Sequence, residues 1–290
     1  MNQSLSIPGR VSVKTGKGGL SYIELRYNGA EAHVYLQGAH VLHYQPAEQA
    51  PVLWHSQKSN FETNRPIRGG IPVCWPWFGA HPSDTTLPAH GLARLVEWEP
   101  IASDSTPITT TVTLRYPNSE KIRASAELIV ILTDDSLTVT LTTTNISTEP
   151  MPLTEALHAY FAVSDIHNIS VHGLEGQPYI DTLPAVRPLR TQTGPITFTK
   201  ETDRIYIDTP RECAIHDPGM NRRILVGKEN SLSTVVWNPW IAKAARMPDY
   251  GDNEYPEMVC VETANCGPNA LRLTPGQTHA LTTRIRVVAL

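Results

Sequence analysis

The strongest constraint on the fold is a pair of neighbouring segments in which apolar and polar side chains alternate. Arg123–Leu132 and Leu137–Asn145 both show this alternation, and the second segment is rich in threonine. A period of two places successive side chains on opposite faces of an extended strand. Thr133–Ser136 separates the two segments and contains two aspartates, as is typical of a hairpin loop. The pattern therefore predicts two paired β-strands.

Similar short segments recur along the chain, separated by turns that contain Gly, Pro, Asn or Asp. Met151–Val163 fits either a helix or a strand by its pattern. Because Pro152 opens this segment and its neighbours are strands, we predict a strand. We expect further strands within Ser21–Tyr44 and at Val52–Trp54, Thr109–Tyr116, Ile169–Val171, Arg204–Asp208, Cys213–His216, Arg223–Val226, Thr234–Trp237, Met258–Glu262 and Thr282–Val288.

A single helix is predicted over Trp240–Met247, with Asn238 as its cap, Pro239 at its first position and Pro248 at its end. A chain with many short strands and almost no helix is typical of a large β-sandwich. No linker, charge block or internal repeat divides the sequence. We therefore interpret residues 1–290 as one all-β domain.

The charge balance limits the classes of partner. The net charge is −4, with 40% apolar and 18% charged residues, so there is an ample core and no overall basic field for nucleic acid or an anionic membrane. The chain has no apolar run of the ~18 residues that a membrane span needs, and its N-terminus lacks the apolar region of a signal peptide. The four cysteines form no CxxC pair, so we expect reduced, mostly buried thiols and a cytoplasmic location.

The densest group of functional residue types lies in Ile67–Arg94. Arg68 is followed by two glycines, which permit a tight turn or the close approach of a ligand. His90 and Arg94 follow after a loop, and three aromatic residues between them and Arg68 add flat apolar surface. These residues predict the floor of a pocket for an anionic, partly apolar ligand, such as a phosphorylated sugar. The alternative is that both arginines lie on the surface and His90 only forms a turn.

His158 is a candidate for proton transfer. On a strand it would share a face with Thr154, Ala156 and Tyr160, and the small side chains of that face leave room for a ligand. The alternative is a buried structural histidine whose ring is bonded to a backbone carbonyl.

Glu262 is the matching carboxylate candidate. It would share a strand face with Met258 and Cys260, at the end of an apolar strip. An apolar environment raises the pKa of a glutamate from its usual value of about 4.3, which makes it a better base near neutral pH. The alternative is a surface glutamate at the end of a strand.

The other acidic residues and the histidines indicate less. Asp203 precedes a predicted strand and is either a turn residue or a ligand-binding group. We interpret Asp249–Glu254 as a solvated loop, with closure over a pocket as the alternative. The chain has 11 histidines but no HxH or HExxH spacing, so we predict no metal site. There is also no GxSxG, P-loop or dinucleotide-binding motif.

Six motifs occur in an order that resembles one enzyme family: IRGGIPVCWPWFG, LPAHGLAR, LTEALHAYF, TDRIYID, VVWNPW and MVCVETAN. They are similar to those of the D-hexose-6-phosphate mutarotases, or glucose-6-phosphate 1-epimerases, of the galactose mutarotase-like superfamily. The resemblance extends from about Leu36 to about Val288. It implies an antiparallel β-supersandwich that interconverts the α and β anomers of a hexose 6-phosphate without a cofactor.

The resemblance also implies roles for individual residues. His158 and Glu262 match the catalytic histidine and glutamate, while Arg68, Arg94 and Asp203 match residues that bind the substrate. His90 lies in the LPxHG motif, where Ala89 replaces a glutamine that contacts substrate in some relatives. We further expect Trp237 or Trp77 to stack on the apolar face of the sugar.

Two other functions remain open at this point. One is a mutarotase for unphosphorylated aldoses, although such a sugar does not need two guanidiniums. The other is a noncatalytic protein that binds sugar phosphates, although binding alone does not need a matched acid and base. We expect a monomer whose partner is a small sugar phosphate rather than nucleic acid or a membrane.

Overall fold

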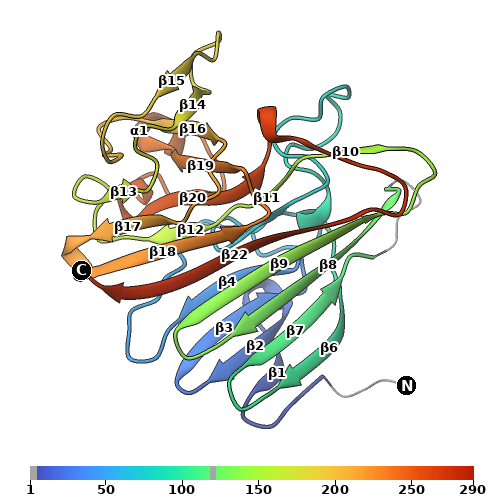
Figure 1. Cartoon of the computed structure of the whole chain (residues 1–290). Helices are drawn as coiled ribbons and strands as arrows, with labels where there is room; N and C mark the ends of the chain where they lie inside the picture. Colours follow the sequence, from blue (N-terminus) through green and yellow to red (C-terminus); the bar gives the residue numbers. More distant parts are fainter. Residues whose placement is uncertain (1–4, 118–121) are drawn as a thin grey trace.

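Antiparallel strands form nearly all of the regular structure in the computed structural model, which describes residues 5–117 and 122–290 (Figure 1). An eight-stranded sheet, here called the long sheet, has the order β13-β17-β18-β22-β9-β8-β7-β6. Its strands are β6 (Glu99–Ser105), β7 (Thr110–Arg115), β8 (Ala124–Leu132), β9 (Ser136–Asn145), β13 (Ser170–His172), β17 (Cys213–Asp217), β18 (Arg222–Glu229) and β22 (Thr278–Ala289).

A second eight-stranded sheet, here called the site sheet, has the order β15-β14-β16-β19-β20-β11-β5, and β12 also pairs with β20. In Figure 1 its strands lie behind and above the long sheet. Its strands are β5 (Val73–Cys74), β11 (Glu155–Leu157), β12 (Tyr160–Ala162), β14 (Pro178–Asp181), β15 (Leu189–Thr191), β16 (Thr202–Ile207), β19 (Ser233–Asn238) and β20 (Met258–Asn265).

Two smaller sheets and a few short helices complete the described structure. The first sheet contains β1 (Val11–Thr15), β2 (Ser21–Tyr27), β3 (Ala30–Tyr35) and β4 (His40–Gln45), and β2 and β3 pack against β7 and β8. The second contains β10 (Met151–Leu153) and β21 (Leu271–Leu273). The helices are α1 (Trp240–Ala244) and the 3-10 helices η1 (Lys17–Gly19), η2 (Ala93–Leu95), η3 (Pro218–Met220), η4 (Tyr255–Glu257) and η5 (Gly267–Asn269). In the part of the chain that the structure describes, no helix has the length and apolar character needed to cross a bilayer.

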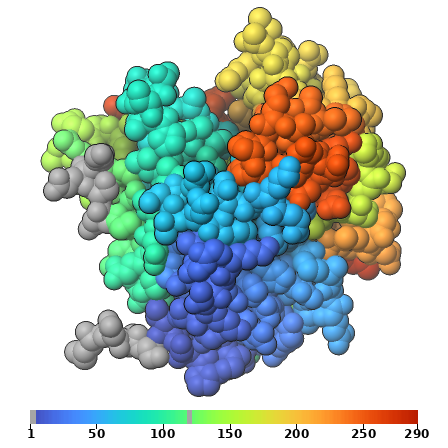
Figure 2. Space-filling view, turned by 180° about the vertical axis from the view of Figure 1, so that it is seen from behind, coloured from blue at the N-terminus to red at the C-terminus, as the bar shows by residue number. Residues whose placement is uncertain are grey.

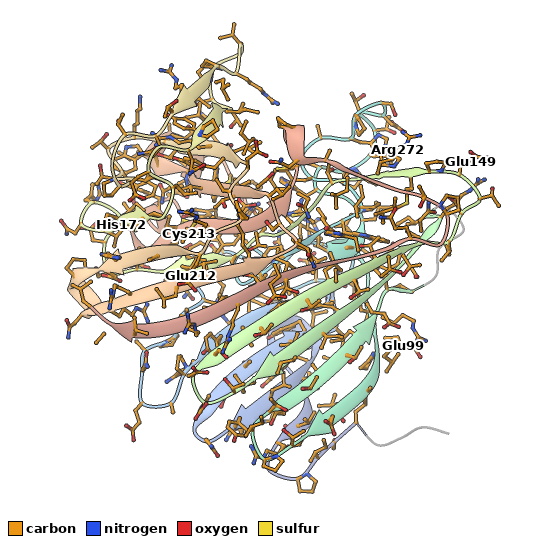
Figure 3. The ribbon with its side chains drawn as sticks, viewed as in Figure 1. Glu99, Glu149, His172, Glu212, Cys213 and Arg272 are labelled. Atoms are coloured by element: carbon orange, nitrogen blue, oxygen red, sulfur yellow. The ribbon has the colours of Figure 1, made fainter. Side chains whose placement is uncertain are left out.

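The core lies between the sheets, and β8 shows how the sequence pattern forms it. Burial alternates strictly along this strand, where Leu128, Val130 and Leu132 are fully buried and the residues between them are only half-buried. Full burial of each such side chain contributes about 1.5–3 kcal/mol. Figure 3 shows the side chains of the long sheet, including Cys213 on β17 and His172 on the adjacent β13. All four cysteines are free and buried, as predicted.

The all-β prediction is confirmed, but three local predictions are wrong. Val52–Trp54 is not a strand, because only Leu53 forms an isolated bridge, to Phe161. Met151–Val163 forms three short strands instead of one. The helix ends at Ala244 rather than Met247, and Pro239 precedes its first residue.

The break within Met151–Val163 has a clear cause. After β11 the chain leaves its pairing with β20 and bonds to the segment around Pro72, where His158 N donates to Pro72 O and Tyr160 N donates to Gly70 O. His158 therefore lies between two strands rather than on one. The predicted faces are nevertheless correct, since Leu157 and Phe161 enter the main core while His158 and Tyr160 point the other way, into a pocket.

Candidate active site

A pocket of about 510 Å³ lies where side chains from β12, β16, β19 and β20 meet, with further walls from loops and from α1. Six of the residues singled out in the sequence line it: Arg68, His90, His158, Asp203, Trp237 and Glu262. These residues are far apart in the chain. The fold therefore gathers them on one concave surface.

The imidazole of His158 and the carboxylate of Glu262 lie next to each other in this pocket, with His158 Nε2 at 3.3 Å from Glu262 Oε1. Glu262 lies on β20, between β19 and β11, and is only 1% exposed. His158 follows β11, where its bond to Pro72 fixes the backbone, and it is 9% exposed. Both groups are thus removed from bulk water, yet both reach the pocket.

Burial determines the protonation of this pair. Removal from water, and then the nearby Asp203, raise the pKa of Glu262 well above its usual value. Removal from water, and then the nearby imidazole of His90, lower the pKa of His158 well below its usual value. Both shifts favour an uncharged pair in which one proton lies on the carboxyl group. The pair can therefore exchange one proton over a short distance.

Each member of the pair also has a polar atom that is available to a ligand. His158 Nδ1 and Glu262 Oε2 are buried and have no hydrogen-bond partner among the described residues. Buried polar atoms in folded proteins almost always have a partner, so atoms that lack one beside a pocket indicate a ligand.

Aromatic rings enclose the imidazole of His158. The ring of Tyr160 stacks on it at 4.8 Å between centroids and 12° between planes. The rings of His90 and Trp237 approach it edge-on at 5.8 and 6.3 Å. Of the two tryptophans predicted to stack on a sugar, Trp237 lines this pocket, whereas Trp77 lines a different hollow.

Arg68 is held in place by protein groups. Its Nε donates to Asp249 Oδ2 at 3.2 Å, and its Nη2 donates to both carboxylate oxygens of Asp249 at 3.1 and 3.2 Å. Its Nη1 donates to the hydroxyl of Tyr160 at 2.9 Å. Because Tyr160 also stacks on His158, its side chain contacts both the Arg68 guanidinium and the His158 imidazole.

The solvated loop predicted at Asp249–Glu254 is wrong for two of its acidic residues. Asp249 is only 8% exposed, because it pairs with the partly buried guanidinium of Arg68. Glu254 accepts hydrogen bonds from the backbone of Gln57 and Gly251. Only Asp252 remains exposed, in an ion pair with Lys58. Figure 2 shows the segment that contains Asp249–Glu254, in orange, packed beside the blue segment that contains residues 56–58.

Arg94 differs from the other predicted residues, since it does not line the pocket. It lies in η2, where its Nη2 donates to Ala89 O at 2.8 Å, and its buried Nε has no partner among the described residues. Its charge still acts on the site. Burial, and then the charge of Arg94, lower the pKa of His90 to about 3. His90 is therefore neutral, and its Nδ1 accepts from Gly79 N.

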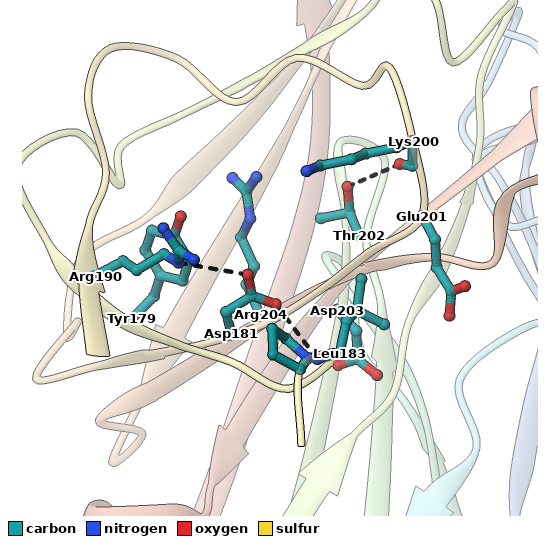
Figure 4. Close-up of a pocket in the computed structure, with 10 residues that line it drawn as sticks. Tyr179, Asp181, Leu183, Arg190, Lys200, Glu201, Thr202, Asp203 and Arg204 are labelled. Atoms are coloured by element: carbon teal, nitrogen blue, oxygen red, sulfur yellow. Dashed lines mark hydrogen bonds and ion pairs between the residues drawn. The ribbon is translucent and has the colours of Figure 1, made fainter. Parts of the chain in front are cut away.

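Asp203 lies within β16 rather than in a turn before it, because Thr202 and Asp203 already pair with Asn238 and Trp237 of β19. Its carboxylate lies 4.0 Å from Lys243 Nζ, which is 3.3 Å from Glu201. Figure 4 shows Asp203 and Glu201 at the edge of a neighbouring hollow of about 340 Å³, in which Asp181 pairs with Arg190. Asp203 lines both cavities.

Residues 21–286 match the model of the aldose 1-epimerase family. The chain belongs to the aldose 1-epimerase family. It is 36% identical over 262 residues to a protein of Cenchrus ciliaris, and 36% identical over 247 residues to a protein of Escherichia coli K12. Both are named "Putative glucose-6-phosphate 1-epimerase". The alignments cover 85% and 84% of this chain, and 78% and 83% of those proteins.

Structural comparison agrees with the family assignment. The crystal structure of a "putative mutarotase" from Salmonella typhimurium matches with a TM-score of 0.89 and 30% identity, over 98% of this chain and 96% of that one. This aldose 1-epimerase family member is therefore a carbohydrate mutarotase with the galactose mutarotase-like β-sandwich that its motifs implied.

Neither Lys243 as a pocket residue nor the pairing of Asp249 with Arg68 was predicted from the sequence. Lys243 lines the pocket from α1, and its Nζ lies 5.7 Å from the centroid of the Trp237 ring. No motif marks either residue. Helix α1 follows β19, and Asp249, which follows α1, pairs with the pocket residue Arg68.

Proposed function

We propose that this aldose 1-epimerase family member interconverts the α and β anomers of a hexose 6-phosphate, such as glucose 6-phosphate, without a cofactor. The observation that carries the proposal is the buried pair of His158 and Glu262, 3.3 Å apart in a pocket that also contains Arg68. The name "Putative glucose-6-phosphate 1-epimerase", which both relatives carry, supports the substrate class.

Glu262 acts as the base at the C1 hydroxyl, and His158 acts as the acid at the ring oxygen. The carboxylate of Glu262 takes the proton from the C1 hydroxyl as the bond between C1 and the ring oxygen breaks. The electron pair of that bond goes to the ring oxygen, which takes a proton from His158. Rotation about the C1–C2 bond presents the other face of the aldehyde. The reverse transfers then close the ring and return both protons, so nothing is oxidised and no group is lost.

The substrate itself supports the ionised form of the pair. Burial favours the uncharged form, but a sugar hydroxyl that donates to Glu262 and a ring oxygen that accepts from His158 both favour the charged form. The proton has to cross only the 3.3 Å between Nε2 and Oε1. Each such acid or base contributes about 10²–10⁴-fold to the rate.

The other residues bind the substrate in this proposal. Arg68 contacts the phosphate, and Arg94 adds positive charge from behind the pocket wall. Asp203 and His90 form hydrogen bonds with sugar hydroxyls, and Trp237 packs on the apolar face of the sugar ring. Anchoring the phosphate fixes C1 and the ring oxygen against the acid–base pair, which lowers the entropic cost of reaction.

The substrate proposal is tested by comparing anomer exchange of glucose 6-phosphate and of glucose by two-dimensional NMR exchange spectroscopy. A charge-assisted contact from Arg68 to phosphate stabilises binding by about 1.5–3 kcal/mol, so kcat/KM for glucose 6-phosphate should be about 10–100-fold higher. Equal values for the two sugars would show that the guanidiniums do not select phosphate, and would favour free aldoses as the substrates.

Replacing Asp249 by asparagine should raise KM for glucose 6-phosphate about tenfold, with a smaller decrease in kcat. Asparagine keeps the shape of the side chain but removes the charge that holds the Nε and Nη2 groups of Arg68. Steady-state kinetics by NMR or polarimetry measures the two constants separately. Asp252→Asn is the matched control, since Asp252 lies in the same loop and pairs only with exposed Lys58. Equal effects of the two variants would contradict the positioning role of Asp249.

A further inference from the structure

A third functional group lies beside the acid–base pair. Cys260 precedes Glu262 by two residues on β20, so the two side chains leave the strand on the same face. One ligand atom each from His158, Cys260 and Glu262 lies within 4.8 Å of the other two, and all three residues are buried. Acid–base chemistry on a sugar does not need a thiol at this position.

The spacing of these atoms is close to that of a metal site. Tetrahedral zinc, with bonds of about 2.0 Å to nitrogen or oxygen and about 2.3 Å to sulfur, places its ligand atoms about 3.3–3.6 Å apart. His158 Nε2 and Glu262 Oε1 are already 3.3 Å apart. Because the sulfur lies within 4.8 Å of the other ligand atoms, a shift of about 1 Å brings it into range.

The chemistry of the three ligands also fits a borderline divalent cation. Thiolate, imidazole and carboxylate are the ligand types that zinc and cobalt accept together. One thiolate and one carboxylate balance a charge of +2, so the bound site is neutral in its buried surroundings. Binding displaces the protons of the thiol and the carboxyl. The unpartnered Glu262 Oε2 offers a further oxygen.

We propose that His158, Cys260 and Glu262 bind a divalent ion of the zinc type, with the fourth coordination position open to the pocket. His158 and Glu262 line the pocket, so the ion enters from that side. The bound ion occupies the lone pairs that transfer protons, and the site is therefore inhibitory and reversible. The inhibition rests on the proposed mutarotase function, whereas the binding does not.

The other candidate cluster among the described residues lacks these properties. Glu24, Glu31 and His33 also lie within range of one another, on the four-stranded sheet, where Glu24 is buried and the other two are half-buried. Lys14 and Arg26 already pair with these carboxylates at 2.6–2.9 Å. Their charges are therefore compensated, and the cluster has no thiolate to select a borderline metal.

The binding is tested with Co²⁺ as a spectroscopic probe and with Zn²⁺ by isothermal titration calorimetry. We expect one ion per chain and a sulfur-to-cobalt charge-transfer band in the near ultraviolet. Cys260→Ser should abolish the band and weaken Zn²⁺ binding by about 100-fold, since even residues one shell away change metal affinity by 10–100-fold. Cys266→Ser is the matched control, because Cys266 is equally buried and lines the same pocket without belonging to the triad. It should keep both the band and the affinity.

Circular dichroism of each variant establishes that it is folded, and Cys260→Ala provides a second variant. A folded wild-type protein without the charge-transfer band, or a Cys260→Ser variant that binds both ions as the wild type does, would overturn the metal site. Zn²⁺ should also slow anomer exchange of glucose 6-phosphate, and a chelator should restore the rate. If Co²⁺ binds through Cys260 but the metal-free protein exchanges no anomers, the metal site stands and the proposed function fails.

Discussion

Glu262→Gln is expected to lower kcat for anomer exchange of glucose 6-phosphate by about 10³-fold, with little change in KM. Glutamine has nearly the same volume as glutamate and still forms hydrogen bonds, but it cannot accept a proton. The loss should therefore fall on the chemical step rather than on binding. NMR exchange spectroscopy at several substrate concentrations measures both constants.

Glu155→Gln is the control for this substitution. Glu155 is also fully buried and lies on β11, next to β20, but it faces away from the pocket toward Asn265 and His279. If burial of a carboxylate in this sheet were the important property, the two variants would lose activity equally. Equal losses in two folded variants would remove Glu262 from the mechanism.

His158→Asn is expected to lower kcat by about 10²-fold or more, because the ring oxygen then leaves without a protein proton donor. Asparagine keeps a polar group at the site but does not titrate. The same exchange measurement applies, with His172→Gln as a control in the long sheet. Unchanged kcat in a folded His158→Asn variant would contradict the role of His158 as the acid.

The two substitutions should not be additive when combined. His158 and Glu262 share one proton at 3.3 Å, so removing either member disables the pair. The double variant should therefore be about as slow as Glu262→Gln alone. Independent effects that multiply would indicate that the residues act in separate steps.

The alternation of side chains was sufficient to predict most of the strands. β8 and β9 lie within one residue of their predicted limits, since a period of two and a buried face determine them together. The prediction of a strand at Val52–Trp54 is wrong because these apolar residues are buried from a loop, in which only Leu53 forms a bridge. The local pattern of apolar residues cannot distinguish a strand from a loop of this kind, because both bury apolar side chains.

The site was predictable only where local sequence determines geometry. The face of His158 follows from alternation, even though the strand breaks at that residue. The pairing of Asp249 with Arg68 joins residues 181 positions apart, and no pattern within the loop indicates it. Asp203 was open to interpretation as a turn residue because its pairing with Trp237 is also long-range.

The position of a hexose phosphate in the pocket tests the central claim most directly. The analogue 1,5-anhydroglucitol 6-phosphate keeps the ring oxygen and the phosphate but has no C1 hydroxyl, so it binds without reacting. A crystal structure of its complex should show the ring oxygen within hydrogen-bond distance of His158, C1 facing Glu262 and the phosphate at Arg68. A phosphate that lies against Glu262, or a ring oxygen that faces away from both residues, would contradict it.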